Sequence, residues 1–432
     1  MNYKAEEVVC EVCGSSNAKL IWEKKPWSQT IILKDGNDLF HDKDVMCLEC
    51  GLIYKNPMLT KDCLREFYDG PYAQMYKPQN TGGISKQDLL DGVVRTTYVL
   101  DFLKSAKCDL QGMKVFEIGS GMGMLLKGVQ SLGAEVFGID MDKRSCDIAK
   151  KLFAFDIPQV DFEKYTCNET YDMIFICNTL EHFYSPREIL CKVFHMLGAK
   201  GKLLVEIPSY VYPYVNIPID SFLSSAHNYT FDYFSFCNLS EQCGYKIDFW
   251  GHTGHNKSMQ FILSKKSVKQ PPRTNMLYNN ALARLIEQDN FRHKIVAIKK
   301  ELFESTDVSI IIEKVLDQFP HTSNQAFIEF ARPLLESGRN EQTIVLMDQY
   351  REGQSENIEI CYATSLHLKG IALRQMGDFL AAKKYFMDAK KNYPRFENYN
   401  FIEELKIDGI ISDSSFSPFT WWNNNKMLEA LG

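Results

Sequence analysis

The stretch V-F-E-I-G-S-G-M-G, residues 115–123, decides most of what this sequence says about its fold. An apolar run leads directly into three glycines, Gly119, Gly121 and Gly123, and a helical pattern begins at Met124. Glycines can adopt positive φ and let the backbone approach a ligand closely, and the start of a helix offers free N–H groups. The stretch therefore predicts a strand, a turn that binds a nucleotide cofactor, and a helix.

A second apolar run strengthens this prediction. Residues 135–139 read as a strand that ends in Asp140, about 20 residues after the first glycine. A carboxylate at that distance is where a ribose-binding acid belongs in a βαβ nucleotide-binding unit. The glycine turn and the acid together are a stronger signal than either alone, and they predict a doubly wound α/β domain.

The glycine spacing G-x-G-x-G, with Glu117 two residues before the first glycine, resembles the first motif of the class I S-adenosylmethionine (SAM)-dependent methyltransferases. Later stretches follow in the family's order: the end of a third strand at 160–162, a buried fourth strand at 171–177, the segment N-T-L-E-H-F-Y-S-P at 178–186, and a turn with a fifth strand at 197–208. The resemblance implies a Rossmann-like domain with a seven-stranded sheet. A doubly wound domain that binds NAD, or no cofactor, is the alternative.

The resemblance also implies contacts with the cofactor. The glycines pass under the methionine and ribose portions of SAM, Asp140 accepts hydrogen bonds from the ribose hydroxyls, and Asp161 or Phe162 contacts adenine. Glu117 orients the loop or reaches the amino-acid end of SAM through water. The residues expected to bind SAM are Glu117, Gly119, Gly121, Gly123, Asp140, Asp161, Phe162 and Asn178.

Candidate catalytic residues follow the fourth and fifth strands, because ligands of open α/β sheets bind beyond the carboxyl ends of the strands. Glu181 and His182 lie there, and His227 falls in a later segment that resembles the acceptor-facing part of related enzymes. A histidine with a pKa near neutrality can take a proton from an acceptor hydroxyl or carbon as the methyl group arrives. The alternative is that these side chains only shape the pocket or cap a helix.

A metal-dependent alternative comes from the small-RNA terminal 2′-O-methyltransferases, whose E-x-x-E-H motif and later histidine form a site for a divalent cation. Here Asn178, Glu181, His182 and His227 resemble that pattern, but an amide replaces one carboxylate and so weakens affinity for a cation. The net charge of −6 and the lack of a long Lys or Arg block also argue against a nucleic-acid partner.

Two C-x-x-C-G knuckles near the start, with Cys10 and Cys13 in the first and Cys47 and Cys50 in the second, predict a four-cysteine zinc site. A filled four-sulfur site leaves no open coordination position, so this zinc would be structural. A redox pair, or a site that has lost its metal, is the alternative. The continuation at 50–72 resembles the lead-in of bacterial methyltransferases that carry a zinc ribbon, many of which act on sugars of surface-polysaccharide or deoxysugar pathways.

At 432 residues the chain exceeds what one core normally serves. We expect a zinc-ribbon domain at 1–76, a turn-rich hinge at 77–83, a methyltransferase domain at 84–266 and, after a proline-containing linker, an all-α domain at 275–432. The sequence shows neither a signal-peptide pattern nor an apolar run of membrane-spanning length. A cytoplasmic protein without a membrane partner is therefore expected.

The all-α region holds one informative window, 368–394, in which Gly370, Ala382, Phe386, Ala389 and Pro394 stand at positions of the tetratricopeptide (TPR) pattern. Small residues there let two helices approach closely, and the proline closes the unit. A degraded second copy lies upstream. Such arrays commonly bind peptides or proteins, so a protein partner is one expectation, and a helical buttress or a dimer contact is the other.

Together these features predict a SAM-dependent methyltransferase with a structural zinc ribbon, acting on a sugar hydroxyl or carbon of a nucleotide sugar or surface glycan. O-methylation is favoured over C-methylation, because sugar C-methyltransferases of this type usually carry a second α/β domain where this chain turns helical. A small non-sugar acceptor and RNA 2′-O-methylation stay open. The rival from another class is a non-catalytic interaction scaffold built on a methyltransferase fold, against which the intact glycines and Asp140 argue.

Overall fold

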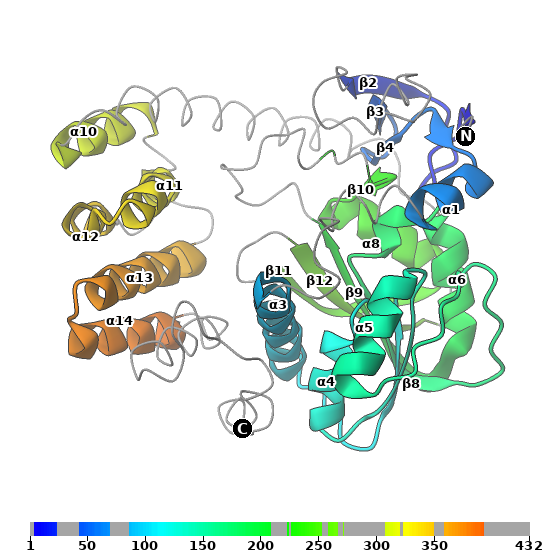
Figure 1. Ribbon diagram of the computed structural model, residues 1–432. Helices are drawn as coiled ribbons and strands as arrows, with labels where there is room; N and C mark the ends of the chain where they lie inside the picture. Colours follow the sequence, from blue (N-terminus) through cyan, green and yellow to red (C-terminus); the bar gives the residue numbers. More distant parts are fainter. Residues whose placement is uncertain are drawn as a thin grey trace. The chain divides into compact units, whose positions relative to one another are not determined.

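The computed structural model describes residues 4–23, 43–69, 86–208, 223, 226–252, 258–266, 271, 307–319, 323–349 and 358–392 (Figure 1). The chain divides into two compact units, one formed by residues 1–212, 219–286 and 425–432 and the other by 213–218 and 287–424. The cysteine knuckles and the glycine turn both belong to the first unit. The predicted hinge at 77–83 lies outside the described residues, and the boundary between 266 and 275 is described only at Pro271. The three-domain division therefore stays a prediction.

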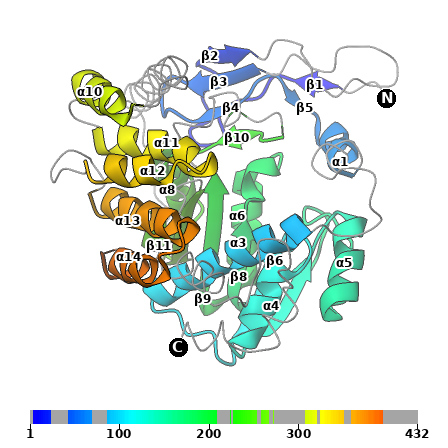
Figure 2. The same ribbon diagram turned by 60° about the vertical axis from the view of Figure 1, so that its left-hand side comes forward.

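The centre of the first unit is a six-stranded mixed sheet (Figure 2). Its order is β11-β12-β9-β8-β6-β7; β6, β7, β8 and β9 run parallel, and β12 and β11 close the sheet antiparallel. This confirms the Rossmann-like α/β fold. The strands are β6 (Lys114–Ile118), β7 (Glu135–Ile139), β8 (Tyr171–Cys177), β9 (Leu197–Pro208), β11 (Tyr245–His252) and β12 (Ser258–Lys265).

The expected seven-stranded sheet has six strands in the part of the chain that the structure describes. Where the third strand was expected, Asp140 and Gln159 form an isolated parallel bridge. The Asp140 N–H donates to the carbonyl of Pro158 at 3.3 Å, and the Val160 N–H donates to the carbonyl of Asp140 at 2.8 Å. Pro158 has no N–H with which to extend the ladder, and a turn begins at Phe162. The seventh strand is thereby reduced to one bridge.

Helices cover both faces of this sheet, and successive residues of its central strands are therefore buried. Met173–Cys177 of β8, for example, are each at most 2% exposed, as expected for a parallel strand between two helical layers. Polar side chains cap several of the helices: Asp142 accepts from the N–H of Arg144 and Ser185 from that of Glu188. The helices are α3 (Lys86–Ser105), α4 (Met124–Ser131), α5 (Lys143–Phe153), α6 (Pro186–Met196) and α8 (Tyr233–Gln242), with the short 3₁₀ helix η1 at Leu180–His182.

A smaller sheet holds the cysteine knuckles and has the order β10-β4-β3-β2. Three strands, β2 (Ala18–Glu23), β3 (Lys43–Cys47) and β4 (Ile53–Lys55), come from the start of the chain, whereas β10 (Tyr229–Thr230) comes from the segment after β9. A separate pair, β1 (Ala5–Glu6) with β5 (Met58–Leu59), leads into α1 (Lys61–Asp69). Two distant parts of the sequence therefore share one small sheet.

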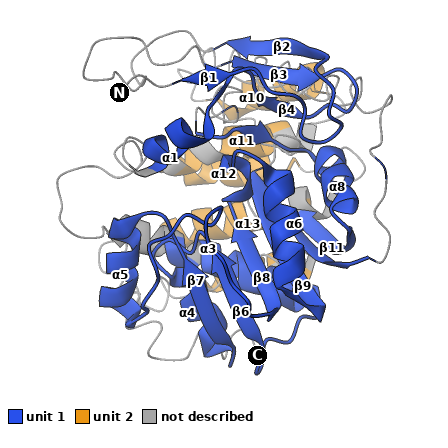
Figure 3. Cartoon of the chain, turned by 90° about the vertical axis from the view of Figure 1, so that its right-hand side faces the viewer, with its two compact units in different colours: residues 1–212, 219–286, 425–432 blue, residues 213–218, 287–424 orange. Residues whose placement is uncertain are grey.

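The second unit is helical in its described residues, and Figure 3 draws it in orange. Its helices are α10 (Val308–Gln318), α11 (Ser323–Glu336), α12 (Asn340–Met347), α13 (Ile358–Gln375) and α14 (Phe379–Asn392). Gly370 of α13 lies against Phe386 of α14, where an added Cβ would overlap the ring, and Ala382 and Ala389 are fully buried. The close helix pair is thus confirmed. Its assignment to the TPR class stays a prediction, and Pro394 lies outside the described residues.

None of the described helices combines the length and the apolar character needed to cross a bilayer.

Candidate active site

The glycine turn lies between the carboxyl ends of β6 and β7. Gly119 has a φ of 74°, and a Cβ at this position would lie 2.5 Å from the hydroxyl of Thr179, so only glycine fits. The Gly119 N–H donates to the carbonyl of Ile139 at 2.9 Å, and the Gly121 N–H donates to Oδ2 of Asp140 at 2.7 Å. The structure therefore brings together the turn and the acid that the sequence pattern paired.

Asp140 is held in place by two backbone donors. Oδ2 accepts from Gly121, and Oδ1 accepts from the N–H of Asp142 at 2.7 Å. Each oxygen of a carboxylate can accept more than one hydrogen bond. Gly123, the third glycine, is the N-cap of α4 at a φ of 73°.

Two carboxylates, Glu206 and Glu117, lie near the carboxyl ends of the central strands. Glu206 of β9 accepts from the side chains of Asn178 at 2.9 Å and Gln260 at 2.7 Å. Glu117 of β6 is 4% exposed, and its Oε2 has no hydrogen-bond partner among the described residues. Burial raises the pKa of Glu117 to about 8, opposed by the positive charge of Arg95. A cation entering this space would give the orphaned oxygen a partner.

Arg95 of α3 is a functional candidate that the sequence analysis missed. Its Nη2 donates to the carbonyl of Cys177, the last residue of β8, at 2.7 Å, and its Nε lies 3.7 Å from Oε1 of Glu206. The Arg95 side chain as a whole is 47% exposed. The sequence signal for Arg95 was its positive charge in the middle of an otherwise apolar and hydroxyl-bearing stretch of helix.

Asn178 was expected among the cofactor-binding residues. It has a φ of 47° immediately after β8. Its amide nitrogen donates to Glu206, and its amide oxygen accepts from the hydroxyl of Ser258 at 3.3 Å. The side chain is thus engaged with the sheet's polar network, and its role toward SAM stays a prediction.

Asp161 and Phe162 were expected beside adenine. The Asp161 carboxylate accepts from Nε of Arg65 in α1 at 2.7 Å. Phe162 is 2% exposed, and its ring lies near those of Tyr165 and Phe183. The structure therefore places one residue in an ion pair and the other in the core, and no described contact tests their role toward adenine.

His182 lies at the end of η1 with a defined orientation. Its Nδ1 lies 2.7 Å from the carbonyl oxygen of Ala226, which can only accept, so Nδ1 carries the proton and Nε2 keeps its lone pair. The hydroxyl of Tyr68 in α1 donates to the same carbonyl at 2.6 Å, and the two rings meet edge to face. Burial lowers the pKa of His182 to about 4, which keeps the ring neutral at pH 7.

Glu181 and His227 complete this group. Both carboxylate oxygens of Glu181 are buried without a hydrogen-bond partner among the described residues, and Oε1 lies 3.9 Å from Nε2 of His182. Burial raises the pKa of Glu181 to about 8. The rings of His182 and His227 are 5.0 Å apart, and burial, followed by the neighbouring His182, lowers the pKa of His227 well below its usual range. The three predicted catalytic residues therefore lie together.

The same three residues have one possible metal ligand each within 4.8 Å of one another. The side chain at the fourth position of the RNA-methyltransferase pattern, Asn178, is hydrogen-bonded to Glu206 and Ser258. The arrangement therefore offers three of the four ligands of that alternative.

Comparisons with known proteins support this reading of the first unit. Residues 116–203 match the family model described as a methyltransferase domain. The chain is 32% identical over 115 residues to a ubiquinone biosynthesis O-methyltransferase of Actinobacillus pleuropneumoniae serotype 7, over 24% of this chain and 49% of the relative. A mitochondrial enzyme of the same name from Schizosaccharomyces pombe is 25% identical over 120 residues, covering 26% of this chain and 43% of the relative.

The chain thus spans about half the length of the curated relatives it matches. Among solved structures, a magnesium protoporphyrin IX methyltransferase from Synechocystis PCC 6803 with bound S-adenosylhomocysteine (SAH) overlaps with a TM-score of 0.38 and 16% identity. The overlap covers 48% of this chain and all of that one.

Tyr68 and Asn228 are further site residues that the sequence analysis missed. Tyr68 comes from α1, ahead of the methyltransferase domain, and its only sequence signal was its place in the F-Y-D-G-P-Y run at 67–72. The N–H of Asn228 donates to the carbonyl of Glu181 at 2.9 Å, and its side-chain amide donates to the carbonyl of His182 at 2.7 Å. Nothing in the local sequence marks Asn228 for this role.

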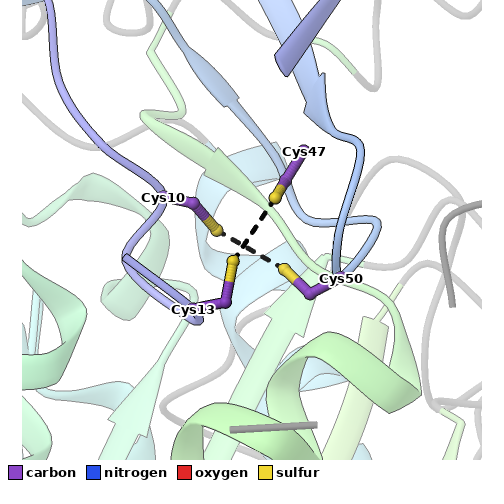
Figure 4. A group of neighbouring side chains, drawn as sticks. All are labelled: Cys10, Cys13, Cys47 and Cys50. Atoms are coloured by element: carbon purple, nitrogen blue, oxygen red, sulfur yellow. Dashed lines mark hydrogen bonds between the residues drawn. The ribbon is translucent and has the colours of Figure 1, made fainter. Parts of the chain in front are cut away.

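The structure brings together the four knuckle cysteines (Figure 4). The Sγ atoms of Cys10 and Cys50 are 3.4 Å apart, and those of Cys13 and Cys47 are 3.5 Å apart. A disulfide needs about 2.05 Å, whereas four sulfurs about 2.3 Å from one tetrahedral zinc ion stand nearly 4 Å apart. The donor set and spacing fit zinc, and the presence of the ion stays a prediction.

Proposed function

We propose that this protein is a SAM-dependent methyltransferase that methylates a hydroxyl group of a small molecule. The observation that carries the proposal is the hydrogen bond from the Gly121 N–H to Asp140, which joins the glycine turn and the ribose-binding acid inside a methyltransferase domain. The relatives are named O-methyltransferases, which favours oxygen over carbon as the acceptor atom.

The described residues fit the two ends of SAM, which when bound would supply a methyl group on a cationic sulfur. Asp140 would accept hydrogen bonds from the ribose hydroxyls. The guanidinium of Arg95 would bind the α-carboxylate, and the orphaned oxygen of Glu117 would accept from the α-ammonium group. The zwitterionic amino-acid end of SAM would satisfy both groups at once.

His182 is the base that we propose for the acceptor hydroxyl. Because its Nδ1 is fixed on the carbonyl of Ala226, Nε2 is the nitrogen that can accept the proton. The ring is neutral at pH 7, so Nε2 has the lone pair that a base requires, but burial lowers the pKa to about 4, below the near-neutral value expected from the sequence. His227 is the second candidate, and Glu181 would stabilise whichever imidazole takes the proton.

For the acceptor we favour a sugar hydroxyl of a nucleotide sugar or surface glycan. Support comes from the resemblance of residues 50–72 to the lead-in of zinc-ribbon methyltransferases that act on sugars. The four cysteines would hold a structural zinc ion, since four sulfur ligands fill its coordination sphere. The helical second unit would offer a surface for a protein partner.

A transfer assay tests the proposal. Purified full-length protein is incubated with methyl-labelled SAM and a panel of nucleotide sugars, small phenols and RNA, and products are separated by mass. Label in a nucleotide sugar supports the sugar acceptor, and its position on oxygen or carbon is read from fragmentation. Label in phenols alone would move the acceptor class to non-sugar small molecules.

The cluster of Glu181, His182 and His227 gives RNA 2′-O-methylation a specific observation in its favour. That alternative requires a divalent cation for activity. Label in RNA that appears only with added Mg²⁺ or Mn²⁺ would replace our proposal with it. If calorimetry of well-folded protein shows no binding of SAM or SAH, the interaction scaffold would be favoured over both enzymes.

A further inference from the structure

The ribbon sheet, which is the small sheet β10-β4-β3-β2 that holds the cysteine knuckles, is completed by the segment that carries His227. The following inference rests on the proposed function. In β10, Tyr229 pairs with Tyr54 and Thr230 pairs with Ile53 of β4. The Lys55 N–H also donates to the carbonyl of Asn228 at 2.9 Å. The backbone directly after His227 is therefore hydrogen-bonded to a strand that the cysteine knuckles hold in place.

Asn228 connects this strand to η1. Its backbone N–H donates to the carbonyl of Glu181, and its side-chain amide donates to the carbonyls of His182 at 2.7 Å and Phe183 at 3.3 Å. Asn228 is 5% exposed, so water cannot readily replace these bonds. One residue thereby links the ribbon strand on one side with the two candidate catalytic residues of η1 on the other.

Tyr68 supplies a second link. It lies on α1, which follows the strand pair β1 and β5, and its hydroxyl donates to the carbonyl of Ala226, the same atom that fixes His182. The orientation of the proposed base thus depends on an acceptor atom shared with a residue from outside the methyltransferase domain.

The first knuckle is itself bound to two helices of the methyltransferase side. The guanidinium of Arg187 in α6 donates to the carbonyls of Glu11 and Val12, and the side chain of Gln242 in α8 donates to that of Val12. These carbonyls lie between Cys10 and Cys13. A change in the geometry of the cysteine site would therefore be transmitted to the elements that surround His182.

The cofactor half of the site, formed by the glycine turn and Asp140, is held by a different set of hydrogen bonds. Gly119 is fixed by Ile139, and Gly121 by Asp140. All four residues belong to the central sheet or its loops, and these bonds do not involve the ribbon. Loss of order in the ribbon would leave these bonds intact.

We infer that the four-cysteine ribbon is a structural wall of the acceptor site, in which metal binding positions His182 and His227 through Asn228 and Tyr68 but leaves the SAM site formed. Asn228 is thus a positioning residue. The ligand of the ribbon is a thiophilic divalent cation, for which zinc is the expected ion.

An experiment that needs no knowledge of the acceptor tests this inference. Full-length protein is compared with zinc bound, after removal of the metal by a chelator under reducing conditions, and after zinc is restored. Diethyl pyrocarbonate modification of each histidine is followed by peptide mass spectrometry, and SAH affinity is measured by calorimetry. We expect severalfold faster modification of His182 and His227 without metal, reversal with zinc, and SAH affinity unchanged within about twofold.

Two histidines serve as internal controls. His195 is exposed on α6, and His367 is buried in the second unit. Neither should change its rate of modification when the metal is removed. A uniform rise at His182, His227 and His367 would mean general unfolding and would overturn the inference. Unchanged rates at His182 and His227 in metal-free protein would overturn it as well.

A variant of Asn228 distinguishes the role of this residue from that of the metal site. Asn228→Asp keeps the shape but replaces the amide donor with an acceptor that faces two carbonyls. We expect it to retain zinc and SAH affinity while His182 becomes severalfold more reactive. Cys10→Ser should have the same effect as removal of the metal. Cys63→Ser should have no effect, because the Cys63 thiol lies outside the cluster. Unchanged His182 reactivity in Asn228→Asp would remove Asn228 from the proposal.

The two proposals can fail separately. If the zinc-bound protein binds no SAH, the proposed function fails, while the histidine reactivities still report on the ribbon. If SAH affinity and histidine protection are lost together on metal removal, the ribbon supports the whole domain, and the inference of a specific acceptor wall is overturned.

Discussion

The two halves of the candidate site are assembled in different ways. The cofactor half is built from one short stretch, in which Gly119, Gly121 and Asp140 are joined by backbone hydrogen bonds between adjacent strand ends. The acceptor half combines Tyr68, from outside the methyltransferase domain, with His182 and with the segment at 226–228. A motif can encode the first half, whereas the second exists only once distant segments pair.

The largest effect should come from removing the proposed catalytic base of the acceptor half. His182→Ala should lower the rate of methyl transfer about 10²–10⁴-fold, because the acceptor proton loses its positioned base. SAH affinity should change less than about threefold, because the cofactor half is untouched. Initial rates on the acceptor found in the panel assay, together with calorimetry, measure both quantities.

The matched variant His227→Ala decides between the two histidines. A rate loss for His227→Ala that exceeds the loss for His182→Ala would transfer the role of base to His227. A parallel loss of SAH affinity in either variant would contradict the independence of the two halves.

Breaking the cofactor half should have the next largest effect. Asp140→Asn removes the charge from the group that accepts from Gly121 and Asp142 and that we propose to bind the ribose. Two charge-assisted hydrogen bonds are worth about 3–4 kcal/mol, so SAH should bind about 10²–10³-fold more weakly in calorimetry. Asp147→Asn, on the exposed face of α5, should have no effect. SAH affinity retained in folded Asp140→Asn would refute the assignment of this half.

A further prediction for the cofactor half concerns Arg95, which we propose to bind the methionine end of SAM. Arg95→Met should weaken SAH binding about 10–100-fold, the value of one charged hydrogen bond that is lost. The binding of 5′-methylthioadenosine, which lacks the amino-acid portion, should be equal in the variant and the parent protein. Equal losses for both ligands would show that Arg95 only supports the fold, and Arg95→Lys reports whether the planar guanidinium is needed.

The smallest effect is a proton released on binding. The pKa of Glu117 is raised to about 8 in the free protein, so this carboxyl is mostly protonated at pH 7 and must ionise to pair with the ligand's ammonium group. SAH affinity should therefore rise with pH between 6 and 7.5, by at most about tenfold per unit. Calorimetry in buffers of different ionisation enthalpy measures the release, which should be close to one proton.

The variant Glu117→Gln should lose this proton release. If the release persists there but is absent in Glu181→Gln, the ammonium partner is Glu181, whose pKa is raised to a similar value. Release that persists in both variants would show that another group titrates on binding.

The sequence could predict elements whose cause is local. Alternation between apolar runs and glycine turns gave β6, β7, β8 and β9, and the knuckles gave the cysteine cluster. It failed at the third strand, because whether residues 159–162 continue a ladder depends on Pro158 and on the turn at Phe162 rather than on their apolar character. Arg95 was missed because a helix pattern does not reveal that its guanidinium reaches the end of β8.

The amino-acid sequence by itself determined the glycine turn, its acid partner, the clustering of four thiols and the presence of helices after the sheet. These features depend on backbone conformation and spacing within a few tens of residues, which side-chain type controls directly. Only the tertiary structure decided that β10 pairs with β4 and that Tyr68 and Asn228 fix His182. These contacts join residues that lie 46 positions apart for Asn228 and His182 and 158 positions apart for Tyr68 and Ala226. Their hydrogen bonds form only after the chain has buried the groups that make them.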